Sequence, residues 1–138
     1  MREIFEQFLK AIEAKDAPVA FSLLTDDVEL FDPHYPVQDM RGIEEVKEGL
    51  TWGLKSLKSM SFTIRHCSEN STSSLAFFEA DCLHVLPNNK PIKFPQVFVV
   101  EYREQKIKAI RAYEPFGPHG FVGFMLKLNR FIWRLTHK

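Results

Sequence analysis

The chain has 138 residues, enough for one domain with a single hydrophobic core, and 45% of them are hydrophobic, as in soluble globular proteins. Its 18 Lys and Arg residues balance 18 Asp and Glu residues, and this zero formal charge argues against a protein that binds nucleic acid through a basic surface. Phe occurs 13 times, which favours an apolar interior or cavity over a polar binding surface.

The cysteines and the N-terminus bear on the compartment. Cys67 and Cys82 have neither the spacing of a CxxC pair nor the density of a disulfide scaffold, so they fit a reducing environment. The first residues lack the basic start and apolar run of a signal peptide, and no apolar stretch is long enough to span a membrane. The sequence therefore predicts a cytoplasmic protein.

Helices are expected in the first half of the chain. Apolar residues at helical spacing predict a helix over residues 2–15. Asp16 is suited to cap a short second helix, in which Pro18 is tolerated in the first turn. A third helix is expected to start at Gly42 and to extend to about Leu57.

A short strand over residues 28–32 lies between these helices and is the most informative stretch of the sequence. In an extended conformation Val28, Leu30 and Asp32 point to the same side, so an acidic residue stands in line with two core residues. Pro33 then ends the strand. An acid on an apolar face, followed closely by His and Tyr, is what a small buried active site would need.

The second half of the chain has a period of two, which indicates long strands joined by short polar turns. Helices followed by consecutive strands predict the α+β class with an antiparallel sheet, in a single domain over residues 1–138. The expected strands cover residues 60–67, 75–86, 92–102 and 107–114.

Four pieces of the chain, in this order, resemble one family: AKDAPVAFSLLTDDVELFDP, RGIEEVKEGL, the pair of hairpins and KIKAIRAYEPF. They are similar to the SnoaL-like branch of the NTF2-like superfamily. The resemblance implies a strongly curved antiparallel sheet wrapped by helices into a cone, with a pocket inside and a homodimer formed through the outer sheet face. The family includes ketosteroid isomerases, polyketide cyclases and epoxide hydrolases, so the fold does not settle the function.

By this resemblance Asp32 matches the general base of the isomerase branch; the alternative is an Asx-type cap of the turn at Pro33. The two oxyanion donors of that branch would fall at about Phe8 and Val97, which donate no hydrogen bond. The familiar ketosteroid isomerase mechanism is therefore not expected. An epoxide hydrolase would need an Asp–Arg–Asp arrangement, for which Arg41 and Arg65 are the available arginines.

Three further titratable residues are candidates for acid–base catalysis. His34 is either a second catalytic group or a surface histidine. His84 stands on the face of residues 75–86 that is expected to point inward, where it is either catalytic or structural. Glu114 is expected near the mouth of the pocket, either paired with Asp32 or paired with an arginine at the rim, Arg111 or Arg41.

The leading hypothesis is a domain that binds a small hydrophobic molecule in its cone and performs cofactor-free acid–base chemistry of the isomerase, cyclase or hydratase type. The alternative is a noncatalytic ligand-binding or dimeric scaffold module. No HxH, HExxH or phosphate-loop spacing calls for a metal or a cofactor. The residues expected to contact the ligand are Phe8, Tyr35, Trp52, Phe78, Cys82, Val97, Ile110 and Ala112.

Residues 121–138 are expected to form an amphipathic helix with a basic stripe and a broad apolar face. One interpretation is a helix that lies on a membrane surface. Packing on the sheet or on a dimer partner is favoured instead, because the rest of the chain is neutral.

Overall fold

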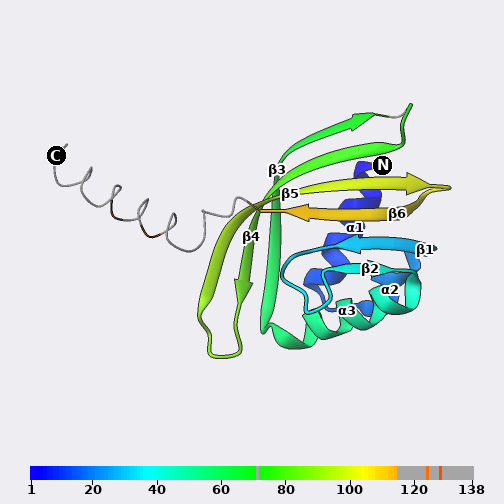
Figure 1. Cartoon of the computed structure of the whole chain (residues 1–138). Coiled ribbons are helices and arrows are strands. Elements are labelled where there is room, and N and C mark those ends of the chain that lie inside the picture. The colour runs from blue at the N-terminus through cyan, green and yellow to red at the C-terminus, as the bar shows by residue number, and fades with distance from the viewer. Residues whose placement is uncertain (71, 115–123, 125–127, 129–138) are drawn as a thin grey trace, which may run out of the picture.

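The computed structural model describes residues 1–70 and 72–114, together with Phe124 and Leu128. Over these ranges the chain forms three helices and one six-stranded sheet, which confirms the predicted α+β class (Figure 1). The helices are α1 (Arg2–Glu13), α2 (Ala17–Ser22) and α3 (Ile43–Ser56). The strands are β1 (Leu24–Phe31), β2 (Asp39–Arg41), β3 (Ser59–Asn70), β4 (Leu75–Val85), β5 (Pro91–Arg103) and β6 (Lys106–Tyr113).

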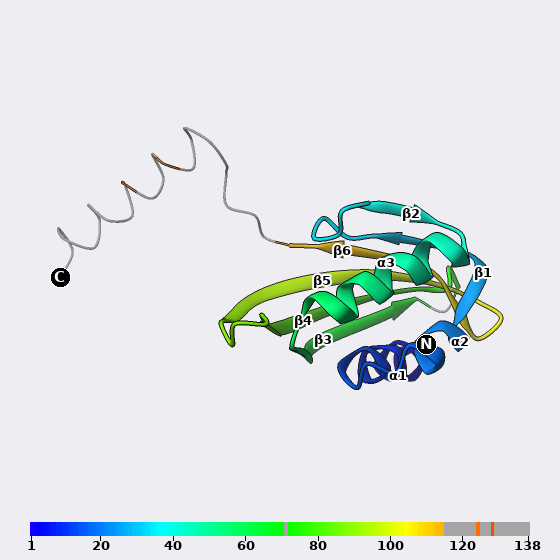
Figure 2. The same cartoon turned by 90° about the horizontal axis from the view of Figure 1, so that it is seen from below.

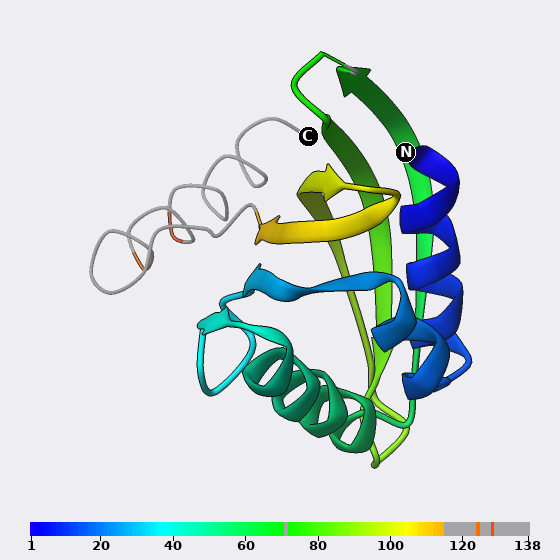
Figure 3. The ribbon, with the colours of Figure 1, turned by 90° about the vertical axis from the view of Figure 1, so that its right-hand side faces the viewer.

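The strands lie in the order β2-β1-β6-β5-β4-β3, and every neighbouring pair is antiparallel except β1 and β6. The long strands β3, β4 and β5 bend strongly, so the sheet is curved but not closed (Figures 1 and 3). α1 and α3 lie on the concave side of the sheet (Figures 2 and 3). The interior of the protein is therefore enclosed by α1 and α3 on one side and by the bent strands on the other.

The apolar face of α1 anchors the helix to the inner face of the sheet. Phe5 is fully buried, and its ring lies 4.6 Å from that of Phe78 on β4 and 5.2 Å from that of Phe98 on β5. These rings are tilted or edge-on, the arrangements that aromatic pairs prefer. The helix predicted over residues 2–15 is thus found as α1, and its buried side chains pack on the sheet.

The predicted helix starts are also found. The side chain of Asp16 accepts a hydrogen bond from the backbone N–H of Val19 at 3.1 Å, as an N-cap does. Gly42 precedes α3 with φ of +81°, in the left-handed region that glycine enters without a steric cost. The chain can therefore turn sharply from β2 into the helix.

The sequence missed two features of the sheet near the site. β1 begins at Leu24, earlier than expected, because the polar run of Thr25, Asp26 and Asp27 hides its period of two. β2 was not expected at all. Its three residues pair with the end of β1, and so the loop between the two strands becomes a closed turn that holds the segment after Asp32 in place.

A bulge in β3 changes which side chains face inward. Phe62 and Ile64 point inward as the alternation predicts, but the register shifts between Ile64 and His66. The side chain of His66 is consequently 80% exposed, whereas Cys67 is partly buried. His66 therefore lies far from the interior.

The helix expected over residues 121–138 lies outside the described residues, apart from Phe124 and Leu128. In the part of the chain that the structure describes, no helix is both long enough and apolar enough to cross a membrane.

Candidate functional site

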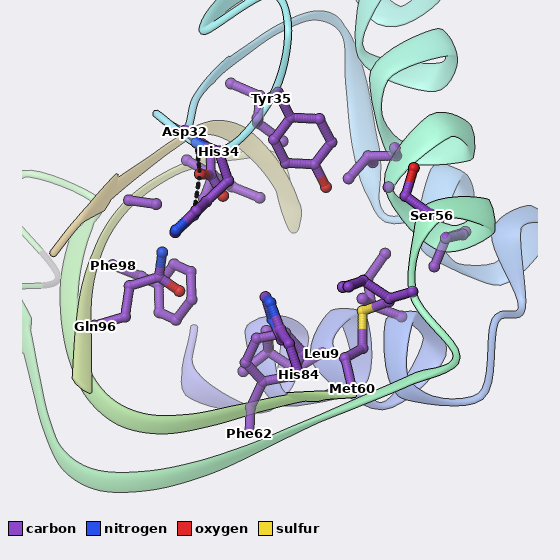
Figure 4. Close-up of a pocket in the computed structure, with 18 of the residues that line it drawn as sticks. Leu9, Asp32, His34, Tyr35, Ser56, Met60, Phe62, His84, Gln96 and Phe98 are labelled. Carbon is purple, nitrogen blue, oxygen red and sulfur yellow. Dashed lines mark hydrogen bonds and ion pairs between the residues drawn. The ribbon is translucent and has the colours of Figure 1, made fainter. Parts of the chain in front are cut away.

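A cavity of about 250 Å³ lies between α1, α3 and the concave face of the sheet (Figure 4). Its wall is mainly aliphatic and aromatic, with a few polar groups among these side chains. Five residues that were expected to contact a ligand line it: Phe8, Tyr35, Trp52, Ile110 and Ala112. Three of the four candidates for catalysis also line it: Asp32, His34 and His84.

The other three expected ligand contacts do not line the cavity. Val97 was assigned to the wrong face of its strand: its side chain lies on the outer face, 39% exposed, and its neighbour Gln96 points inward instead. A shift of one residue in the register inverts the face of a strand, and this is the source of the error. Phe78 and Cys82 do face inward, but Phe78 packs against Phe5 and Cys82 donates to Gln96, both behind the cavity wall.

Asp32 follows β1 directly, and the inward alternation of that strand carries its side chain into the cavity wall, where it is 17% exposed. Its Oδ1 atom accepts a hydrogen bond of 2.9 Å from the backbone N–H of His34. The same oxygen lies 3.0 Å from His34 Nδ1. Asp32 therefore caps the turn at Pro33 and also faces the cavity, so the two interpretations of this residue are compatible.

Glu114 comes from a distant part of the chain and joins Asp32 and His34 in a cluster of three titratable side chains. It follows β6, its side chain is 8% exposed, and its Oε1 atom lies 2.9 Å from His34 Nε2. Gln96 Nε2 donates to the same oxygen at 3.3 Å. The expected arginine partners are not used, since Arg111 and Arg41 pair with other carboxylates. Glu114 thus reaches Asp32 through His34 rather than directly.

The imidazole of His34 is held between two carboxylates, and its electrostatics follow from this. The pKa of His34 is raised, mainly by the hydrogen bond to Asp32 and against the opposing effect of burial. The pKa of Glu114 is also raised, because burial disfavours its charge more than the charge of His34 favours it. A charged imidazole has an N–H on each nitrogen, so it can donate to Asp32 and Glu114 at once.

His84 lies on the opposite wall of the cavity from His34, with their ring centroids 6.4 Å apart. It packs edge-on against Phe94 at 4.9 Å and against Phe62 at 6.1 Å. Burial lowers the pKa of His84, and the neighbouring charge of His34 lowers it further. His84 is therefore a neutral imidazole in apolar surroundings.

Tyr35 closes the cavity on the side of α3. Its ring centroid lies 5.9 Å from that of Trp52, and its hydroxyl sits where a Cβ atom on Gly53 would approach to 2.7 Å. Burial raises the pKa of Tyr35 well above its ordinary value, so the phenol stays neutral. The glycine at position 53 is thus what allows the tyrosine to lie against the helix.

Gln96 is the residue of this site that the sequence analysis missed. The signal was present, because Gln96 alternates with Phe94 and Phe98 in a strand whose inner face is otherwise apolar. A buried polar side chain in such a row requires a partner, and Gln96 finds one in Glu114.

Two kinds of site can be compared with this geometry. Among residues 1–70 and 72–114, no group of three or more His, Cys, Asp or Glu side chains is arranged to hold a metal ion. No arginine of the described chain lines the cavity, and Arg65 pairs with Asp81 outside it, so the Asp–Arg–Asp arrangement of an epoxide hydrolase is not assembled there. What the cavity offers is a carboxylate supported by an imidazole, with a second imidazole opposite.

Solved structures with the same fold share little sequence with this chain. A Catenulispora acidiphila protein of ketosteroid isomerase-like fold, in complex with trimethylamine, is 16% identical, with a TM-score of 0.72 over 83% of this chain and 87% of that one. A Mycobacterium tuberculosis protein in complex with estradiol-17β-hemisuccinate is 14% identical, with a TM-score of 0.70 over 80% and 89%. An epoxide hydrolase of the LEH-like type from M. tuberculosis is 15% identical, with a TM-score of 0.69 over 99% and 95%.

At these identities the likeness shows the fold alone. No curated protein matches the sequence at a significant level. The sequence does match the family model of the SnoaL-like domain, over residues 5–110. That match covers most of the chain, from the first helix to the last strand of the curved sheet, and the chain belongs to the SnoaL-like family.

Proposed function

We propose that this protein binds a small hydrophobic molecule in its cavity and moves a proton on it without a cofactor, with Asp32 as the base. The observation that carries the proposal is the position of Asp32, in the wall of an apolar cavity and held by His34. A general base has to lie within reach of the proton that it takes, and the two contacts with His34 fix the orientation of this carboxylate.

The size and lining of the cavity define the class of ligand. A cavity of 150 Å³ lined by apolar side chains is known to hold benzene, so about 250 Å³ suits a molecule of one or two rings. The wall offers only a few polar groups, and the ligand should therefore be mostly apolar. Two structural neighbours are in complex with trimethylamine and with estradiol-17β-hemisuccinate, which supports small-molecule binding in this fold.

The three residues of the cluster have separate tasks in this proposal. Asp32 takes a proton from a carbon atom of the ligand and returns it to the same or to a neighbouring atom. His34 fixes the carboxylate of Asp32 through its backbone N–H and its ring nitrogen Nδ1. Glu114 holds His34 from the other side and so orients the ring. The donors of the familiar isomerase are absent at Phe8 and at Val97, so this assignment does not depend on them.

Binding and proton transfer can be tested separately. Trp52 lines the cavity, and replacing the other tryptophan, Trp133→Phe, makes its fluorescence a specific reporter of binding. Tetralin and α-tetralone, two-ring molecules without and with a carbonyl group, are suitable probes. Proton transfer is measured as the exchange of the α-hydrogens of α-tetralone in deuterated buffer, above the buffer rate.

We expect Asp32→Asn to abolish the exchange while the protein stays folded and still binds tetralin. Asp39→Asn is the matched control, because Asp39 is exposed and pairs with Arg41 outside the cavity. Binding without any Asp32-dependent exchange would favour the noncatalytic ligand-binding module instead. Failure of both probes to bind would overturn the proposal as a whole.

The homodimer implied by the family resemblance stays a prediction. It concerns the outer face of the sheet, where Phe77, Val97 and Tyr113 are each about two-fifths to one-half exposed. A charged side chain in such an apolar surface opposes association. Sedimentation velocity of the wild type and of Val97→Glu checks it, and a monomeric wild type would contradict it.

A further inference from the structure

A groove lies between α3 and the loop that joins β1 to β2, and the proposed function does not use it. It encloses about 510 Å³, and its larger apolar side chains are those of Tyr35, Val37, Met40 and Trp52. Val37 and Trp52 are exposed to solvent. A single exposed apolar residue is ordinary, whereas two in one groove mark a surface that a partner can cover.

The charged side chains that line this groove are all acidic. They are Asp39, Glu45 and Glu48, and no Lys or Arg of the described chain lines it. Lys47 of the same helix turns to Glu44 instead. Because a binding surface matches its partner in charge as well as in polarity, the groove suits a segment that is both apolar and basic.

Residues 115–138 of the same chain have this composition. They contain four basic residues, Lys127, Arg130, Arg134 and Lys138, and no Asp or Glu. Since the whole chain has zero formal charge, residues 1–114 carry a net charge of minus four, and the two parts attract each other. Phe124 and Leu128, which the structure describes, are exposed and open to a partner.

The groove also lies within reach of this segment. β1 and β6 pair in parallel, so β6 ends beside the loop that follows β1 (Figures 1 and 3). Glu114 contacts His34 in that loop at 2.9 Å, and Tyr35, the next residue, already lines the groove. Residues 115–120 can span about 20 Å when extended. A linker this short gives an effective concentration on the order of millimolar, which favours the chain's own segment over that of a second molecule.

The spacing of the segment allows apolar and basic side chains to face the groove together. In the helix expected over residues 121–138, Lys127 follows Phe124 by three positions and precedes Phe131 by four, and such positions are neighbours on a helix. Arg134 stands in the same relation to Phe131. The long stems of Lys and Arg can also lie on an indole ring while their charges stay near carboxylates.

We propose that residues 121–138 dock in the groove of their own chain, with apolar side chains against Val37 and Trp52 and basic side chains toward the three carboxylates. This contact does not depend on the proposed function. Trp52 and Tyr35 line the cavity as well as the groove, so the docked segment would cover the outer side of the cavity wall. A second copy of the chain and an anionic membrane are the other possible partners.

The test locates the segment in the full-length protein. A nitroxide label is attached through Asn129→Cys in a Cys67→Ser background, where Cys82 is buried and does not react. The label broadens the NMR signals of amides near it. We expect broadening at Val37 and Gly49, which line the groove, and sharp signals at residues 66–70 of β3, at the opposite edge of the sheet from β2.

Charge variants show whether the contact is the proposed one. Glu48→Lys should weaken docking by about fivefold, as expected when an exposed ion pair becomes a like-charge contact, and should sharpen the groove signals. Glu104→Lys is the matched control, because it makes the same change at an exposed turn between β5 and β6. Should Glu48→Lys fail to fold, salt replaces it: raising NaCl from about 0.1 M to about 1 M shortens the Debye length from about 10 Å to about 3 Å and should also sharpen the groove signals.

A second measurement uses Trp52 as the reporter. In the Trp133→Phe background, the combined change of Lys127, Arg130 and Arg134 to Gln should make the fluorescence of Trp52 easier to quench with acrylamide, because its cover is weakened. The same three changes should leave the melting temperature nearly unaltered, since the groove belongs to the surface. Unchanged quenching would contradict docking over Trp52.

The remaining outcomes separate the three partners. Labelled ¹⁴N protein is mixed with unlabelled ¹⁵N protein, and broadening of the groove signals in this mixture would assign the groove to a second copy and overturn the proposal. Sharp groove signals in the labelled protein would overturn it too. If the segment then binds vesicles of phosphatidylserine in sedimentation, a membrane surface is its partner instead. Groove broadening that neither Glu48→Lys nor salt reduces would refute the charge matching on which the proposal rests.

Discussion

His34 joins two segments that are far apart in the chain, and its removal should have a measurable effect on stability. It contacts Asp32 at 3.0 Å and Glu114 at 2.9 Å. A hydrogen bond to an ionised group contributes about 1.5–3 kcal/mol when shielded from water, and screening of a side chain that is 41% exposed reduces this to about 1 kcal/mol. We therefore expect His34→Ala to lower the free energy of unfolding by about 2 kcal/mol while the imidazole is charged.

This contribution should depend on pH. A charged imidazole donates to both carboxylates, whereas a neutral one has a single N–H and must present a lone pair to the other oxygen. Because the pKa of His34 is raised in the folded state, the stabilisation is complete below the ordinary histidine pKa of ~6.5 and is lost as the pH rises through the folded value. The pKa of Glu114 is raised as well, so the stability of the wild type also falls as the pH rises through the titration of this carboxyl group.

The assay is urea unfolding of the wild type and His34→Ala at about pH 5.5 and about pH 9, on either side of the histidine titration. We expect a difference of about 2 kcal/mol at the lower pH and about 0.5 kcal/mol at the higher one. His66→Ala is the control, because His66 is exposed and lies 3.9 Å from its nearest carboxylate. An effect of His34→Ala that is equal at both pH values, or larger at the higher one, would refute the two-donor explanation.

Three further predictions concern the core and the cavity wall. Phe5→Ala should cost about 3–5 kcal/mol of stability in thermal or urea unfolding, because the ring is fully buried among other aromatic rings; a loss below about 1 kcal/mol would contradict this packing. Gly53→Ala should weaken tetralin binding more than Gly49→Ala, measured by tryptophan fluorescence, since its new Cβ meets a tyrosine hydroxyl and ring, whereas that of Gly49→Ala meets the flexible end of a methionine. The thiol of Cys82, which is 2% exposed and whose pKa burial raises to about 12, should react with a thiol reagent far more slowly than Cys67 in the folded protein and at a similar rate after unfolding.

The local elements of this fold could be predicted from the sequence, because their causes lie within a few residues. The period of α1, the cap at Asp16 and the turn after Asp32 each depend on neighbouring side chains and backbone groups. Alternation along β4 likewise brought His84 to the inner face without knowledge of any other strand. These features are short-range, and their physical signal is therefore present in the order of the residues.

The candidate site, in contrast, depends on pairings between strands that the sequence does not specify. The one-residue error that exchanged Val97 for Gln96 is settled only by the register of β5 against β4 and β6. The bulge in β3, which turns His66 outward, is a further choice of this kind. Each depends on which backbone groups find partners across the whole sheet.

The contact between His34 and Glu114 shows most clearly what only the tertiary structure decided. These residues are separated by 80 positions in the sequence, and they meet because β1 and β6 pair in parallel, so that both strands end at the same edge. Sequence reasoning offered Glu114 either Asp32 or an arginine at the rim as its partner, and did not consider His34. The curvature of the sheet instead places an imidazole there, and since ion pairs act over a few ångströms, that placement decides which charges interact.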